Sequence, residues 1–100
     1  MRVVMIIVIN NLKWNLSFTN RLYHKDDGAC SDPTNITGKR RIRVRDSLTG
    51  ERRLVVLLHE MLHAADWSKD ETWVEKIAED IGKVLYDCGW RRISEESPQE

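Results

Sequence analysis

The sequence predicts an α+β fold in which a small, mostly antiparallel sheet packs on two consecutive helices. Three observations predict this class: a β-branched apolar run near the N-terminus, an alternating segment of Arg with Ile and Val, and two long helical patterns in the second half. With 100 residues and a hydrophobic fraction of 41%, the chain is expected to form one globular domain with a small core. We assign this domain to residues 1–92 and a flexible tail to residues 93–100.

The strand signals lie in the first half of the chain. The run Val3–Ile9 is rich in β-branched residues and predicts a buried first strand. Since no small-residue cleavage site follows this run, a secretory signal peptide is the weaker interpretation. A second strand is expected at Asn15–Leu22, and residues 24–38 predict a loop because Asp, Gly, Pro and Asn recur there. Arg41–Arg45 predicts a half-buried strand whose arginines face water.

Two helices are predicted in the second half. Residues 51–66 place apolar side chains around most of a helix, so this helix is expected to be the central one. In the short spacer that follows, Ser68 and Glu71 have the spacing of a capping box. The next helix carries one apolar stripe between positions 74 and 88, and Gly89 should end it. The short spacer predicts an antiparallel helical hairpin. Three tryptophans are expected to complete the core: Trp67, Trp73 and Trp90.

Charge and hydropathy exclude several classes of function. Sixteen Lys and Arg residues balance sixteen Asp and Glu residues, so neither nucleic acid nor an anionic membrane is expected as a partner. No apolar run approaches the roughly 18 residues of a membrane-spanning helix. Cys30 and Cys88 lie far apart in the chain, and this spacing fits two free thiols in a cytoplasmic protein.

The segment His59-Glu60-Met61-Leu62-His63 carries the chemistry of the sequence. Histidines four residues apart lie one turn apart on one helix face, where both imidazoles can bind a single zinc ion. Glu60 would project beside that ion, where it can take a proton from an activated water molecule and deliver it to the leaving amine. The alternative is two histidines with no ligand role, but an unpartnered pair of buried imidazoles would be costly.

A catalytic zinc site also needs a third protein ligand and an open fourth position. His24, the remaining histidine, lies in a distant loop, and acids of the second helix are better placed. Glu71 lies near the centre of the apolar stripe and is the preferred ligand, while Glu75 lies to one side as an outer partner or alternative ligand. The capping box offers Glu71 a competing role. Asp66 either hydrogen-bonds a ligand imidazole or only ends the helix.

The stretch from Leu57 to Trp67 resembles the active-site helix of small metallopeptidases of phages and prophages. Residues 71–78 (ETWVEKIA) are similar to the E-x-x-A-N-x-F-A segment of ImmA/IrrE-like and other gluzincin peptidases. This resemblance implies a minimal zincin-like domain in which Glu71 is the third zinc ligand. It also implies that the strand Arg41–Arg45 is the edge along which an extended peptide lies. The chain departs from the family in its short linker before Glu71 and in having Glu75 where the family has Asn or Asp.

The sequence therefore predicts zinc-dependent hydrolysis of peptide bonds, with one zinc ion on His59, His63 and Glu71 and with Glu60 as general base. The expected substrate is a peptide or protein in the cytoplasm of a bacterial or phage-infected cell. The main alternative is a non-catalytic, zinc-stabilised phage regulatory domain that binds a protein partner, because a structural metal would help so small a core. A third interpretation is hydrolysis of a non-peptide amide by the same groups.

Overall fold

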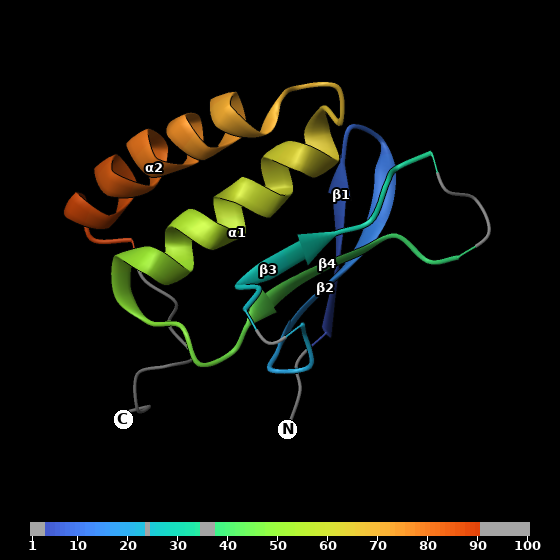
Figure 1. Cartoon of the computed structure of the whole chain (residues 1–100), viewed down its shortest axis with the longest axis horizontal. Helices are drawn as coiled ribbons and strands as arrows, with labels where there is room; N and C mark the ends of the chain where they lie inside the picture. Colours follow the sequence, from blue (N-terminus) through green and yellow to red (C-terminus); the bar gives the residue numbers. More distant parts are fainter. Residues whose placement is uncertain (1–3, 24, 35–37, 91–100) are drawn as a thin grey trace.

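The computed structural model describes residues 4–23, 25–34 and 38–90, and it has the predicted α+β class (Figure 1). Both helices lie on one side of the sheet, and α1 runs between the sheet and α2 (Figure 1). The predicted tail at 93–100 and the candidate His24 lie outside the described residues. The elements in chain order are β1 Val4–Ile9, β2 Leu12–Thr19, β3 Gly28–Cys30, β4 Arg41–Arg45, α1 Gly50–Ala65 and α2 Glu71–Asp87.

The sheet has the strand order β1-β2-β4-β3. Its two outer pairs, β1 with β2 and β3 with β4, are antiparallel, and the central pair of β2 with β4 is parallel. The prediction of a loop at residues 24–38 was wrong in part, because β3 lies within this segment. The prediction that Arg41–Arg45 is an edge strand was also wrong, since β3 pairs outside it. A three-residue Gly-Ala-Cys strand carries no alternating pattern, so only its pairing in space identifies it.

The first strand forms where it was predicted, but it is not buried. β1 is the other edge of the sheet, and Ile6 is 70% exposed. Val4 and Val8 share its face, which points away from the helices because strand residues alternate between faces. Asn10 and Asn11 adopt positive φ angles of 53° and 66°, which suit the tight turn into β2.

The core lies between the sheet and α1. Arg41–Arg45 forms a strand as predicted, and Ile42 and Val44 are fully buried. Burying a side chain of this size contributes about 1.5–3 kcal/mol to stability. Trp14, Leu16 and Phe18 of β2 extend the same cluster. The fully buried tryptophan is thus Trp14, whereas the three tryptophans predicted in the core are each at least 41% exposed: Trp67, Trp73 and Trp90.

The helices form close to their predicted bounds and pack tightly as a pair. A Cβ atom on Gly82 of α2 would lie 2.6 Å from the Val55 side chain, so this glycine permits the close approach of α1 and α2. Gly89 follows the last turn of α2 with φ at 98°, as predicted for a helix stop. Neither helix in the described part of the chain is long and apolar enough to cross a membrane.

The start of α2 differs from the predicted capping box. Asp70 is the N-cap, and its carboxylate accepts a hydrogen bond of 2.7 Å from the backbone N–H of Trp73. Ser68 instead donates its hydroxyl to the Asp66 carboxylate. This arrangement makes Glu71 the first residue of α2 and leaves its side chain available for other contacts.

Candidate metal centre

The helix α1 brings its two histidines together at its C-terminal end. The ring centroids of His59 and His63 lie 4.9 Å apart, and both side chains are largely buried. Apolar residues on other faces of α1 hold this helix between the sheet and α2, so the histidine face is turned toward the start of α2. The one-turn spacing that was predicted from sequence is therefore present in the structure.

Glu71 joins the two histidines from the neighbouring helix. One carboxylate oxygen lies 2.9 Å from Nε2 of His59, and the other lies 2.9 Å from Nε2 of His63. In the part of the chain that the structure describes, His59, His63 and Glu71 form the group that could hold a metal ion. One ligand atom from each residue lies within 4.8 Å of the others. Glu75 does not belong to this group and is exposed. The geometry thus favours Glu71, the acid preferred from the helical pattern.

The donor set suits a zinc ion. Two imidazole nitrogens and one carboxylate are typical ligands of catalytic zinc sites. Tetrahedral bonds of about 2.0–2.1 Å separate neighbouring ligand atoms by roughly 3.3 Å. The two histidine–Glu71 separations, each to a different carboxylate oxygen, are 2.9 Å, and the three ligand atoms lie within 4.8 Å of one another, so they would draw together around an ion. The Glu71 carboxylate contacts Nε2 of both histidines, and a zinc ion would bind these same atoms.

Glu60 lies beside this group with its side chain against β3. It is only 8% exposed, and a Cβ atom on Gly28 would lie 2.8 Å from one of its carboxylate oxygens. Gly28 therefore provides the space that the Glu60 side chain occupies. Burial, together with smaller effects of the charges of Glu71 and Asp26, raises the pKa of Glu60 to about 7. The group can thus exchange a proton near neutral pH.

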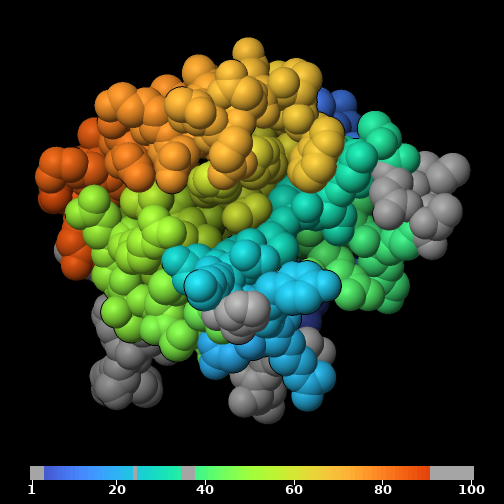
Figure 2. Space-filling model, in the orientation of Figure 1, coloured from blue at the N-terminus to red at the C-terminus, as the bar shows by residue number. Residues whose placement is uncertain are grey.

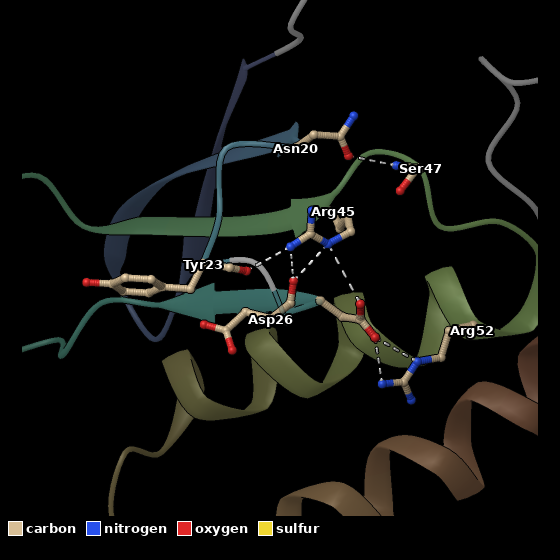
Figure 3. Close-up of polar contacts among 7 residues, drawn as sticks. Asn20, Tyr23, Asp26, Arg45, Ser47 and Arg52 are labelled. Carbon is tan, nitrogen blue, oxygen red and sulfur yellow. Dashed lines mark hydrogen bonds and ion pairs between the residues drawn. The ribbon is translucent and has the colours of Figure 1, made fainter.

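The segment before β3 is fastened by arginines (Figure 3). The Arg45 guanidinium donates a hydrogen bond of 2.9 Å to the backbone oxygen of Tyr23, and its Nε–H donates one of 2.8 Å to the backbone oxygen of Asp26. Arg52 of α1 forms an ion pair of 3.0 Å with Asp27. These contacts hold β3 against α1. The prediction that the strand arginines face water was therefore wrong for Arg45.

Asp66 and Trp67 flank the site at the end of α1. The Asp66 carboxylate accepts hydrogen bonds from the Ser68 hydroxyl at 2.6 Å and the Ser68 backbone N–H at 3.1 Å, and these bonds lower its pKa. Of the two roles that the sequence left open for Asp66, these bonds fit the one at the helix end and not a hydrogen bond to a ligand imidazole. The Trp67 ring lies 5.8 Å from the His63 ring and forms a partly exposed wall beside it.

Cys30 of β3 lies on the same side as Glu60 but is not suited to nucleophilic chemistry. Burial, together with smaller effects of the charges of Glu60 and Asp32, raises the pKa of its thiol to about 12. The thiol is therefore protonated at neutral pH. Because only the thiolate is reactive, Cys30 is not a nucleophile here. Glu60, with a pKa of about 7, is the group that can exchange a proton near neutral pH.

A recess separates α2 from β3, with atoms of α1 at its floor (Figure 2). Sequence reasoning found the groups on α1 and α2 but missed Gly28, which approaches Glu60 from β3. The Asp-Gly pair at 27–28 is a turn signal, and nothing in its spacing connects it to Glu60. Antiparallel pairing with β4 brings Gly28 to the site.

No protein-family model, curated protein or solved structure matches this chain.

Proposed function

We propose that this chain is a zinc-dependent metallopeptidase that hydrolyses peptide bonds, with zinc on His59, His63 and Glu71 and with Glu60 as general base. One observation carries the proposal. The Glu71 carboxylate contacts both imidazoles at 2.9 Å, and the buried Glu60, which directly follows His59 on α1, is close enough to Glu71 for that charge to help raise its pKa. The resemblance of residues 57–78 to phage and prophage peptidases supports the same function.

The bound ion would act as a Lewis acid that polarises a water molecule and the peptide carbonyl. The chain's own residues would supply the remaining chemistry. The two imidazoles and Glu71 would hold the ion. Glu60 accepts the proton of the attacking water and delivers it to the nitrogen of the departing amine. Burial against Gly28 suits Glu60 to this role, because it keeps the pKa of the carboxyl group close to neutral pH.

Solvent access favours a catalytic site over a structural one. A structural zinc site is closed by four protein ligands, whereas a catalytic site keeps one position open. The described residues provide three ligands, and the Glu71 side chain is 67% exposed. Substrate and water could therefore reach an ion bound by these residues. This accessibility argues for hydrolysis and against the alternative of a zinc-stabilised domain that only binds a partner.

The edge strand β3 offers a place for an extended substrate. Within the described residues β3 pairs with β4 alone, so its other edge presents free backbone groups next to Glu60. A peptide added along this edge would pass through the recess. We assign the peptide to β3 in place of β4. The two free cysteines support a reducing compartment such as the cytoplasm.

Metal analysis and proteolysis together test this function. We expect the purified wild type and Glu60→Gln to bind one zinc ion each, and only the wild type to cleave a peptide library. Loss of a general base should reduce kcat/KM by about 10²–10⁴-fold. Cleavage by Glu60→Gln at the wild-type rate would remove Glu60 from the mechanism. Zinc binding without cleavage of any peptide by the wild type would favour the non-catalytic domain.

A further inference from the structure

The strand β1 is an unprotected edge of the sheet. In the described part of the chain it pairs with β2 alone, so its other side has no neighbouring strand. Its six residues include no charge and no proline, which are the residues that commonly protect an edge strand from pairing with another chain. Four of its apolar side chains are at least 50% exposed: Val4, Met5, Ile6 and Val8. An exposed apolar surface of this kind indicates an interaction.

The backbone groups of β1 that face outward can be identified from β2. The N–H of Asn15 donates to the backbone oxygen of Arg40 at 2.9 Å, so the backbone groups of Asn15 point toward β4. Because the backbone groups of successive strand residues point to opposite sides, Trp14 is directed to β1, where it pairs with Ile7. Ile6 alternates with Ile7 and therefore directs its N–H and C=O away from β2. The same holds for two further residues, Val4 and Val8.

The sequence of β1 is symmetric in character about Ile6. Valines lie two positions before and after it, at Val4 and Val8, and Met5 and Ile7 are its direct neighbours. In an antiparallel pair of two copies centred on Ile6, this residue would face its own equivalent, and Val4 would face Val8. Each of these facing pairs would exchange two backbone hydrogen bonds, because the outward groups of both copies meet. Apolar side chains on the same face of such pairs stabilise a sheet further.

The exposure of Met5 shows what a second copy would cover. Met5 is on the face of the sheet that packs on the helices, since it lies opposite the buried Leu16, yet it remains 50% exposed. In the symmetric pair, Ile7 of the second copy would lie opposite Met5 and continue this apolar layer. The charged Lys13 lies opposite Val8 on β2, which is the side of β1 away from the second copy. Like charges of described residues therefore do not meet across the pair.

We propose that two copies of this chain form a dimer by antiparallel pairing of their β1 strands about Ile6. Two four-stranded sheets would join into one sheet of eight strands. The two-fold symmetry closes the assembly, because each copy uses the same edge for the contact. Both candidate metal centres would stay open, since they lie beside β3, at the opposite edge of the sheet from β1 (Figure 1). This inference does not depend on the proposed peptidase function.

The contact is small, and this limits its strength. A pair of six-residue strands is smaller than the roughly 800 Å² per partner of a standard interface, so we expect a Kd on the order of 10–100 μM. At concentrations well below this Kd the chain is a monomer, in which Ile6 is an exposed residue. Sedimentation velocity of the full-length chain, from about tenfold below to about tenfold above the expected Kd, measures the equilibrium.

Charge substitutions at the two-fold axis test the pairing. Ile6→Lys and Ile6→Glu each place like charges opposite one another, so each variant alone should dimerise at least about tenfold more weakly than the wild type. An equimolar mixture of the two places opposite charges across the axis and should restore a dimer with one copy of each. Val84→Lys is the control, because Val84 is 61% exposed on α2 and should leave the Kd unchanged. Circular dichroism melts check that each variant is folded.

Several outcomes would overturn the inference. A wild type that stays monomeric at the highest concentration would do so, as would the wild-type Kd in both Ile6 variants. Loss of the dimer in Val84→Lys, with Ile6→Lys unaffected, would move the contact to α2. If the two folded Ile6 variants fail to dimerise when mixed, the strands do not pair about Ile6. Growth beyond two copies would show an open contact in place of the closed two-fold pair.

Discussion

The two edges of the sheet differ in almost every respect. The β1 edge has six residues, is wholly apolar in sequence, and exposes Val4, Ile6 and Val8. The β3 edge has three small residues, lies against α1, and is fastened through Asp27 to two arginines. The candidate site lies beside β3. The segment with the stronger strand signal is thus remote from the chemistry, and the segment with the weaker signal helps to build the site.

This difference shows what strand propensity can and cannot indicate. β-branched residues predict extended backbone, but they do not specify which strand becomes an edge. Position in the sheet depends on pairing between residues far apart in the chain. The short β3 edge depends instead on a close approach to Glu60 that requires Gly28. Perturbations of the β3 side should therefore affect metal binding and catalysis, whereas changes in β1 should not.

Removal of the metal should have the largest effect. Zinc present at 1,000 times its Kd would stabilise the folded chain by about 4 kcal/mol, so a chelator should lower the melting temperature and abolish cleavage. Amide hydrogen exchange should then speed up at the start of α2 and in β3, and remain unchanged in β1. The two edges would prove to be coupled if β1 lost its protection to the same degree.

The pH dependence of the metal-free chain should come next in size. Because the pKa of Glu60 is raised from 4.5 to about 7, the folded state keeps a proton that the unfolded state releases. The stabilisation from this group is present below pH 4.5 and is lost as pH rises to 7. A shift of this size corresponds to about 3 kcal/mol.

Urea unfolding of the metal-free wild type and Glu60→Gln across this range measures the effect. The difference in unfolding free energy between the two proteins should change between pH 4.5 and 7, while histidine titrations common to both cancel. A difference that stays constant over that range would mean that Glu60 is not desolvated in the folded chain.

A side chain at Gly28 should also destabilise the β3 edge. In Gly28→Val the new Cβ would meet the Glu60 carboxylate at 2.8 Å and the Val56 side chain at 2.9 Å. Forcing atoms into packed space costs about 1–3 kcal/mol, and displacement of Glu60 should lower kcat/KM. Gly38→Ala is the matched control, because no atom lies within 4 Å of its added Cβ. Wild-type activity in Gly28→Val would separate Gly28 from the site.

The smallest effect is expected at the β1 edge. Ile6→Thr changes an exposed side chain and keeps a β-branched residue, so stability should change by at most about 0.5 kcal/mol. Zinc affinity and kcat/KM should equal those of the wild type. A loss of zinc affinity in this variant would contradict the separation of the two edges.

Local sequence patterns predicted the two helices and the site residues that they carry. The parts of the fold that depend on pairing between distant strands could not be predicted in this way. Helical periodicity defined α1 and α2, and helix geometry alone brings His59 and His63 to one face. The apolar stripe of the second helix favoured Glu71 over Glu75. The strand β3, and with it the role of Gly28, could not be predicted, because its place follows from pairing with β4 and not from its own three residues.

Zinc titration of matched glutamate variants tests the central claim most directly. The wild type should bind one zinc ion per chain. Glu71→Ala, which removes the carboxylate between the two imidazoles, should bind zinc at least about 100-fold more weakly, since affinity depends on the number of ligands. Glu75→Ala should retain wild-type affinity. Wild-type affinity in Glu71→Ala, or a loss confined to Glu75→Ala, would contradict a metal centre formed by His59, His63 and Glu71.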